Sequence, residues 1–191
     1  MKLSEVIEIK LGMNLSRHKE KAELKIYSND DLLADLNGLS HSPVYSRHPV
    51  IMDKQMTHCV DKGDIIYSFI NSIAGLVSSH NSGKIINQNF ARIVVDSTKL
   101  DSSYLCYLLN DNVEIEKQKA LLMQGSTLRK LSPASIRNFD VDLPDLDKQR
   151  VIGTLYLDWL KRQALAKKQL ELEESVFMNF LDKMNTTTIE K

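Results

Sequence analysis

The chain has 191 residues, of which 42% are apolar, and its 25 basic residues balance its 25 acidic residues. This composition supplies enough apolar material for the core of one domain, and the scarcity of glycine and proline argues against a disordered, collagen-like or turn-rich all-β chain. Two cysteines, Cys59 and Cys106, exclude a disulfide scaffold and a four-cysteine zinc site, and polar interruptions in every apolar run exclude a membrane-spanning helix, so we expect a soluble, cytoplasmic protein with reduced thiols.

The first half of the chain is expected to form short strands separated by loops and turns. Alternating or continuous apolar segments predict the strands, and residues 36–49, which contain Asn37-Gly38 and two prolines, indicate a loop. A turn at Lys62-Gly63-Asp64 precedes a buried strand. The strands are expected at residues 3–10, 24–27, 65–67, 85–86 and 90–95.

Helical spacing of apolar residues begins after Leu100. Asp101 is suited to cap the first helix, because its carboxylate can accept hydrogen bonds from the free N–H groups of the first turn. Ser132-Pro133 has the pattern of a cap followed by proline at the first helical position. The helices are expected at residues 102–110, 112–123 and 133–138, followed by a short alternating strand at 139–143.

A single long helix is predicted at the C-terminal end. Residues 147–184 contain no proline and only one glycine, Gly153, and a helix of about 38 residues would be about 57 Å long. Such a helix projects beyond a small domain, so we expect its apolar stripe to pair with a partner helix. Two shorter helices folded back on the domain are the alternative. The stripe consists of Ile152, Leu155, Trp159, Leu170, Phe177, Leu181 and Met184.

Basic and polar residues gather in stretches that contain no acid. No aspartate or glutamate lies between Asp64 and Asp96 or between Glu116 and Asp140, and a surface built from such stretches can meet a polyanion even when the whole chain is neutral. Amide and guanidinium groups contact base edges. Candidate base-reading residues, selected by chemistry and position, are Arg17, His18, Arg47, His48, Asn71, His80, Asn81, Lys84, Asn87, Gln88, Asn89 and Arg92.

A second polar segment is centred on Gly125. Hydroxyls, backbone N–H groups and cations are the usual phosphate contacts, and the candidates here are Gln124, Ser126, Thr127, Arg129 and Lys130. Two structural alternatives remain open. The amides at residues 87–89 could form a turn that satisfies its own backbone, and the second segment could be a helix C-cap with solvated charges.

No catalytic, metal or cofactor site is predicted. The sequence has no P-loop, nucleophile elbow or glycine-rich dinucleotide loop, and His41 and His48 have no cysteine or carboxylate at metal-ligand spacing. Acid-x-Lys triplets, which help nucleases to hold Mg²⁺, occur at residues 8–10 and 23–25. About two such triplets are expected by chance in this composition.

A series of short motifs follows in order along essentially the whole chain. They are Leu3-Ser4-Glu5-Val6, Val60-Asp61-Lys62-Gly63-Asp64-Ile65-Ile66-Tyr67-Ser68, Asn87-Gln88-Asn89-Phe90-Ala91-Arg92-Ile93, Gln124-Gly125-Ser126-Thr127, Val141-Asp142-Leu143-Pro144 and Lys148-Gln149-Arg150. Through this order, rather than through any one motif, the chain resembles the DNA-specificity (S) subunit of type I restriction–modification systems.

The resemblance implies a mixed α/β (α+β) target recognition domain, residues 1–145, followed by a long conserved-region helix, residues 146–191. The helix is expected to pair with a second one as an antiparallel coiled coil. The resemblance also implies a subunit without catalytic residues that reads double-stranded DNA and docks on modification (methyltransferase) subunits, which methylate adenine. A restriction subunit can join such a complex to cleave DNA. No cofactor is implied for the S subunit itself.

Members of this family usually carry two recognition units, whereas this sequence holds one. It therefore resembles a half-length subunit, and a two-fold homodimer would pair its helix and read an interrupted palindrome. Pairing with a different half-subunit, a remnant of a truncated gene and a decoy that occupies the modification subunit are alternatives. A further alternative from another class is a small metal-dependent DNA-processing enzyme that uses Glu8, Glu23 and Lys25.

Overall fold

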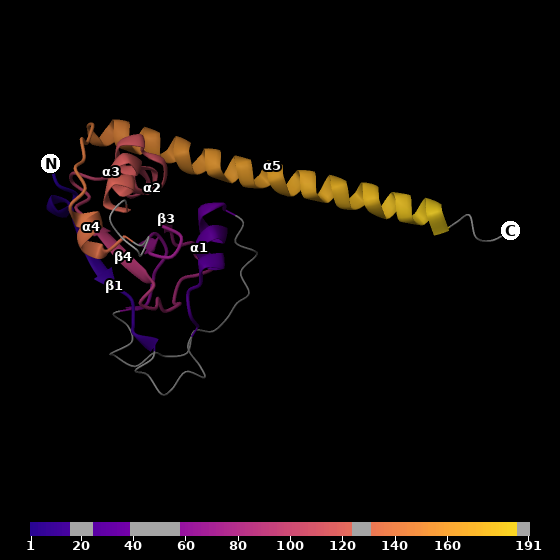
Figure 1. The fold of residues 1–191 in the computed structure, drawn as a ribbon, viewed down its shortest axis with the longest axis horizontal. Helices are drawn as coiled ribbons and strands as arrows, with labels where there is room; N and C mark the ends of the chain where they lie inside the picture. The colour runs from indigo at the N-terminus through magenta and orange to yellow at the C-terminus, as the bar shows by residue number, and fades with distance from the viewer. Residues whose placement is uncertain (16–24, 39–57, 124–130, 187–191) are drawn as a thin grey trace.

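A mixed α/β body carries one long helix that runs away from it (Figure 1). This arrangement is seen in a computed structural model of the chain, which describes residues 1–15, 25–38, 58–123 and 131–186. It confirms the predicted fold class. In chain order the elements are a 3₁₀ turn η1 (Leu3–Glu5), β1 (Ile7–Leu11), α1 (Asn29–Leu36), β2 (Ile65–Ser68), β3 (Ile73–Leu76), β4 (Phe90–Val95), α2 (Ser102–Asp111), α3 (Val113–Met123), α4 (Pro133–Arg137) and α5 (Leu146–Thr186).

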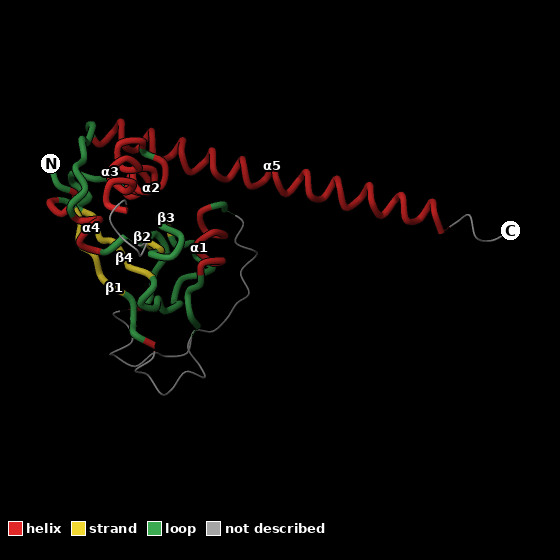
Figure 2. Tube along the Cα trace, in the orientation of Figure 1, coloured by secondary structure: helices red, strands yellow, loops and turns green. Residues whose placement is uncertain are grey.

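The strands form one antiparallel sheet in the order β1-β4-β2-β3, which Figure 2 shows in yellow. Ile9 and Ile65 both pair with Ile93 of the central strand, and all three are buried in the larger core cluster, together with residues of α2. Ile66 and Phe90 belong to a smaller cluster on α1. Because successive side chains of a strand point to opposite faces, helices cover both sides of this small sheet.

The short turn η1, which lies within the strand expected at residues 3–10, was not predicted, and neither were helix α1 and strand β3. Helix α1 begins at a capping box, in which Ser28 Oγ accepts from Asp31 N at 3.1 Å and Ser28 N donates to Asp31 Oδ2 at 2.9 Å. Strand β3 lies inside a stretch rich in serine and asparagine and contains Gly75, which makes room for the Leu32 side chain of α1. A sheet position that needs glycine for helix packing weakens the strand signal in the sequence.

The predicted strand at residues 139–143 is wrong. Phe139 and Val141 are buried, as the alternation requires, but only an isolated bridge between Asp140 and Lys2 has a strand-like pairing. The backbone hydrogen bonds of this segment go to the N-terminal residues, with Leu3 N donating to Phe139 O at 2.9 Å. The alternating pattern of residues 139–143 therefore reflects the burial of one side of the segment and not pairing with a neighbouring strand.

The predicted helices after residue 100 are confirmed, together with their caps. The Asp101 carboxylate accepts from Ser103 N at 2.9 Å and from Tyr104 N at 3.0 Å, and Ser132 caps α4 with Pro133 at its start. Helix α5 is continuous over 41 residues. Among the described residues, none of the helices is both long enough and apolar enough to cross a membrane.

The first turns of α5 are fastened to α2. The buried Gln149 side chain receives a hydrogen bond from Asp101 N at 2.9 Å and donates to the carbonyl oxygens of Lys99 at 2.9 Å and Pro144 at 2.8 Å. One turn later, Gly153 lies directly against the backbone of Tyr104 in α2. The long helix therefore leaves the body at an angle set by the start of α2.

Candidate nucleic-acid interface

Four of the predicted base-reading residues lie at one end of the sheet. Asn71 belongs to the turn between β2 and β3, and residues 87–89 lead into β4. The two segments are neighbours because Ser68 pairs with Phe90 and because Phe69 N donates to Asn89 O at 2.9 Å. The Asn71 and Gln88 side chains are exposed there. The amide groups of Asn71, Asn87, Gln88 and Asn89 thus come from segments that are distant in sequence.

Part of this amide cluster satisfies its own backbone. Asn87 Oδ1 accepts from Asn89 N at 2.8 Å, and Gln88 Oε1 accepts from Leu15 N at 3.3 Å. Gly12 passes so close that a Cβ on it would lie 2.1 Å from the Asn87 carbonyl oxygen. The local-turn alternative therefore describes these two side-chain oxygens.

The β2–β3 turn also meets α3. A cavity of about 340 Å³ separates them, and it is lined by Asn71, Ser72, Ile73, Asn110, Glu116, Lys119 and Ala120. Lys119 is not a free cation, because its Nζ donates to Glu116 Oε1 at 2.6 Å and to the Leu109 carbonyl oxygen at the end of α2. Ala120 lies one helical turn before Met123, after which the candidate phosphate-binding segment begins.

Two predicted cations are ion-paired inside the chain. Lys84 Nζ lies 2.8 Å from Asp31 Oδ1. The Arg92 guanidinium lies 3.3 Å from Asp64 Oδ2 and donates to the Cys59 carbonyl oxygen. Both side chains are about four-fifths buried, with 20% and 21% exposed. Their charges are already neutralised, so contact with DNA would require that these pairs open.

Asn81 has an interior position, which contradicts the expectation that it reads a base. The residue is 1% exposed, and its Nδ2 donates to Asp35 Oδ1 at 2.8 Å. The other oxygen of Asp35 accepts from the Tyr27 hydroxyl at 2.8 Å. The network joins α1 to the loop that follows β3, and its role is to hold the fold. His80, the neighbouring candidate, is partly exposed.

The Asp31–Lys84 pair makes stability depend on pH. Burial raises the pKa of the Asp31 carboxyl, but hydrogen bonds from Lys84 and Ser28 outweigh burial and leave this pKa below its usual value. A carboxyl whose pKa is lower in the folded state stabilises the fold above its unfolded pKa of about 3.9, and this contribution is lost as the pH falls through the folded-state pKa.

We therefore expect Lys84→Met to lower the free energy of unfolding by about 1 kcal/mol at pH 7 and by less at a pH below the unfolded pKa of about 3.9, where the stabilisation by the pair starts to be lost. Urea unfolding at both pH values measures the difference. Lys10→Met is the control, since Lys10 forms an exposed pair with Glu8 at 3.4 Å, and it should change little at either pH. A Lys84→Met deficit that persists unchanged at low pH contradicts the assignment.

Nine predicted DNA-contacting residues lie outside the described residues: Arg17, His18, Arg47, His48, Gln124, Ser126, Thr127, Arg129 and Lys130. Glu23, invoked in the nuclease alternative, also lies outside them. Glu8 is exposed, and within residues 1–15, 25–38, 58–123 and 131–186 no group of three histidine, cysteine, aspartate or glutamate side chains is placed to hold a metal ion.

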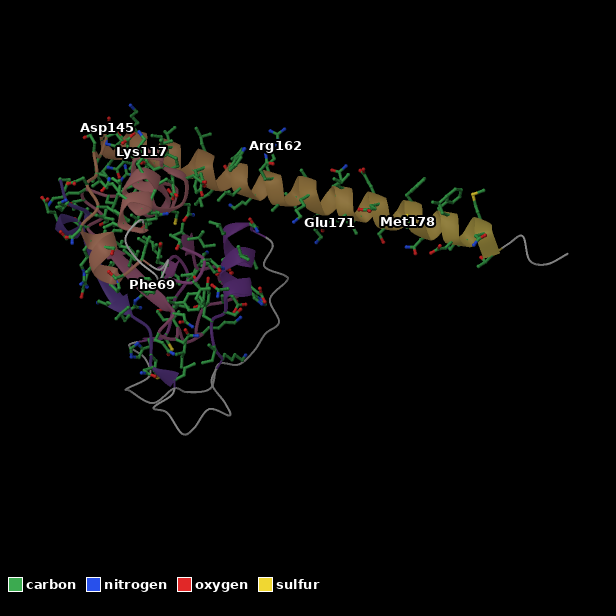
Figure 3. The ribbon with its side chains drawn as sticks, in the orientation of Figure 1. Phe69, Lys117, Asp145, Arg162, Glu171 and Met178 are labelled. Atoms are coloured by element: carbon green, nitrogen blue, oxygen red, sulfur yellow. The ribbon has the colours of Figure 1, made fainter. Side chains whose placement is uncertain are left out.

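The apolar stripe of α5 is exposed beyond the body, as the side chains along the helix in Figure 3 illustrate. Ile152 is the exception. It was predicted to belong to the stripe that pairs with a partner helix, but it packs against the domain's own core beside Gln149 and Tyr156. It therefore belongs to the docking face on α2. The remaining members are between 42% and 66% exposed, and they are Leu155, Trp159, Leu170, Phe177, Leu181 and Met184.

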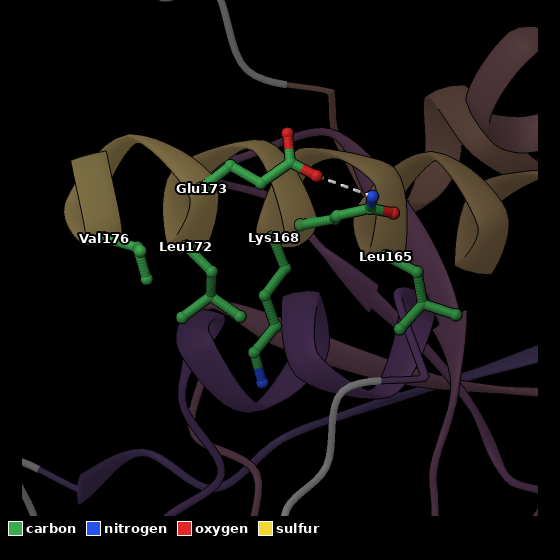
Figure 4. A pocket seen from close by; sticks show the side chains of 6 residues that line it. Leu165, Lys168, Leu172, Glu173 and Val176 are labelled. Atoms are coloured by element: carbon green, nitrogen blue, oxygen red, sulfur yellow. Dashed lines mark hydrogen bonds between the residues drawn. The ribbon is translucent and has the colours of Figure 1, made fainter.

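A second apolar stripe on α5 was missed. Leu165, Leu172 and Val176 line a shallow groove of about 480 Å³ along the helix (Figure 4). Gln169 Nε2 donates to Glu173 Oε1 at 2.7 Å on its polar border. The seven-residue spacing from Leu165 to Leu172, followed by four residues to Val176, is a helical signal that the sequence does contain. The outer helix thus presents apolar groups on two faces.

Comparisons with known proteins agree with this architecture. The family model for the type I restriction modification DNA specificity domain matches residues 1–174. No curated protein matches the sequence. Among solved structures, the HsdS subunit from Thermoanaerobacter tengcongensis is 20% identical, with a TM-score of 0.51 over 89% of this chain and 39% of that chain.

Two other solved structures share the fold at low identity. One, from work on complex assembly and conformational transition of the type I R-M system, is 19% identical with a TM-score of 0.58, over 96% of this chain and 43% of that chain. The S subunit of the type I restriction-modification system from M. genitalium is 13% identical with a TM-score of 0.57, over 96% of this chain and 44% of that chain. The present chain therefore spans 39% to 44% of the length of these structures. Because the family model matches most of its residues, the chain belongs to the type I restriction–modification DNA specificity domain family.

Proposed function

We propose that this chain is a half-length specificity subunit that reads double-stranded DNA and directs partner modification subunits to adenines in the sequence it selects. It performs no chemistry itself, and a restriction subunit, where one is present, acts through the same complex in the cytoplasm. The observation that carries the proposal is the family match over residues 1–174. The amide-rich end of the sheet is the proposed reading surface of the recognition domain, residues 1–145.

Pairing of α5 follows from its exposed apolar stripe. More than half of the Leu155, Leu170 and Phe177 surfaces lie in water, and an apolar stripe exposed in this way marks a site of association with a partner. A second copy supplies an identical stripe, and a two-fold axis perpendicular to the helices gives the antiparallel pairing that the family resemblance implies. The dimer holds two identical recognition domains and therefore reads an interrupted palindrome. The second stripe, which contains Leu172, lies on another face and is left for the modification subunits.

Mapping of adenine methylation in the native cells, with and without the gene, tests this function. We expect deletion to abolish methylation at one interrupted palindromic motif, and we expect the tagged protein to co-purify with an adenine methyltransferase. Unchanged methylation despite co-purification favours the decoy. Two different half-sites favour pairing with another half-subunit. Mg²⁺-dependent DNA cleavage by the isolated chain favours the enzyme.

The proposed phosphate contacts can be distinguished from base contacts by the salt dependence of DNA binding. Replacing Arg129 and Lys130 together with alanine should weaken binding to all DNA sequences about equally and reduce the salt slope by about two. Filter binding of specific and random duplexes over a salt series measures both quantities. An unchanged slope would show that this segment does not touch phosphate, and a loss confined to the specific duplex would make it a base reader instead.

A further inference from the structure

The turn between β2 and β3 displays an apolar and an amide side chain next to each other. Ile70 is 49% exposed although most isoleucines of the described chain are buried. Asn71 follows it, and among the described residues no partner is recorded for its side-chain amide. Figure 3 places Phe69, where the turn begins, in the body of the domain and away from the projecting part of α5. An exposed isoleucine beside a free amide suits a ligand that offers both apolar and hydrogen-bonding groups.

The backbone of this turn is held firmly. Ser68 Oγ accepts from Asn71 N at 3.2 Å and donates to Asn29 Oδ1 at 2.7 Å. Ser72 has a φ of 57° and is the only non-glycine residue with a positive φ in the described part of the chain. Such conformations persist only where the surroundings impose them, and they gather at functional sites. None of these contacts uses the side chains of Ile70 or Asn71, which are thus presented on a fixed support.

The surroundings permit the approach of a polyanion. The chain has no acidic residue from Ile65 through Val95, a segment that includes the turn and the neighbouring amides. The carboxylate that lines the cavity, that of Glu116, is paired with Lys119 at 2.6 Å. The turn also lies beside Asn89, whose carbonyl oxygen accepts from Phe69 N. The turn and the amide cluster form one continuous surface.

We propose that Ile70 and Asn71 are a direct-readout pair for A·T in the major groove of the target DNA, an assignment that rests on the proposed function. An asparagine amide forms two hydrogen bonds with N6 and N7 of adenine, and an apolar side chain contacts the thymine 5-methyl group. Adjacent Cα atoms are about 3.8 Å apart, so the two side chains address the same base pair or neighbouring ones. The β2–β3 turn therefore sets at least one A·T position in each half-site.

Selection of duplexes from a randomised library tests the assignment. The full chain, purified with its co-purifying subunits, is compared with Ile70→Ala, with Asn71→Ala and with the control Leu33→Ala, which removes an isoleucine-sized side chain that is 40% exposed on α1. We expect both turn variants to relax the same A·T position or two adjacent ones, and the control to select the wild-type sequence. If the wild-type complex selects no sequence, the proposed function fails. If the wild-type complex selects a sequence and both turn variants select that wild-type sequence without relaxing any position, only the present inference is overturned.

Modified bases in the selected duplex then test each contact. Uracil in place of the thymine removes the methyl group and should weaken wild-type binding about fourfold. 7-Deazaadenine in place of the adenine removes N7 and should weaken it about fivefold or more. Ile70→Ala should be insensitive to uracil, and Asn71→Ala should be insensitive to 7-deazaadenine. Equal sensitivity of wild type and variants to each modified base would overturn the assignment.

Discussion

Gly153→Ala is expected to destabilise the protein, although the same substitution stabilises an ordinary exposed helix. A Cβ at this position would lie 2.2 Å from Ser103 Oγ and 2.5 Å from Tyr104 N. The backbone of α2 cannot yield, because the Asp101 cap and the Gln149 hydrogen bonds fix it. Overpacking costs about 1–3 kcal/mol and exceeds the gain of about 1 kcal/mol that alanine brings through helix propensity. Because the added Cβ would meet a fixed backbone, the cost lies towards the upper end of this range, and we expect a net loss of up to about 2 kcal/mol.

Urea unfolding of the full chain measures this effect. Thr154→Ala is the matched control, because Thr154 is the next residue of the same helix and is exposed, and its change should stay within about 0.5 kcal/mol. A Gly153→Ala protein as stable as wild type, or more stable, would show that α5 does not need its close approach to α2. Crystals of the variant should show α5 displaced from Ser103.

The long helix and its neighbours could be predicted because their signals are local. The caps Asp101 and Ser132 act on N–H groups two or three residues away, and the continuity of α5 is visible in its composition. The face that α5 turns towards the body could not be predicted. Ile152 and Leu155 have the same apolar character, and only the approach of Ser103 to Gly153, 50 residues apart in sequence, separates the docking face from the free one.

The candidate site likewise has features that could be predicted from local sequence and features that could not. The amides before β4 could be chosen by chemistry, and the sheet brings Asn71 to them. The intramolecular roles of Asn81 and Arg92 could not be foreseen, because their acidic partners Asp35 and Asp64 are supplied by other parts of the chain. Helix α1 carried a readable signal, since Ser28 followed by Asp31 forms a capping box. Ile70 had no local signal, because only the folded turn shows that it is left exposed.

Replacing Leu170 and Phe177 together with glutamate is expected to convert the proposed homodimer into a monomer. Both side chains lie on the predicted stripe, seven residues apart, and they are 66% and 59% exposed in the single chain. Two-fold symmetry places each substitution in the interface twice. Carboxylates without partners in an apolar seam cost several kcal/mol, so the dissociation constant should rise by at least about a thousandfold.

Leu172→Glu separates pairing from docking of the modification subunits. Leu172 is 58% exposed, close to the 66% of Leu170, but it lies about 200° around the helix from it. Light scattering should give a dimer for this variant and a monomer for the double variant, whereas recovery of the methyltransferase should fall for Leu172→Glu. If Leu172→Glu dissociates the dimer and the double variant does not, the two faces have exchanged roles. If wild type is itself a monomer at micromolar concentration, two-fold pairing of α5 is wrong, and a different half-subunit must cover the stripe.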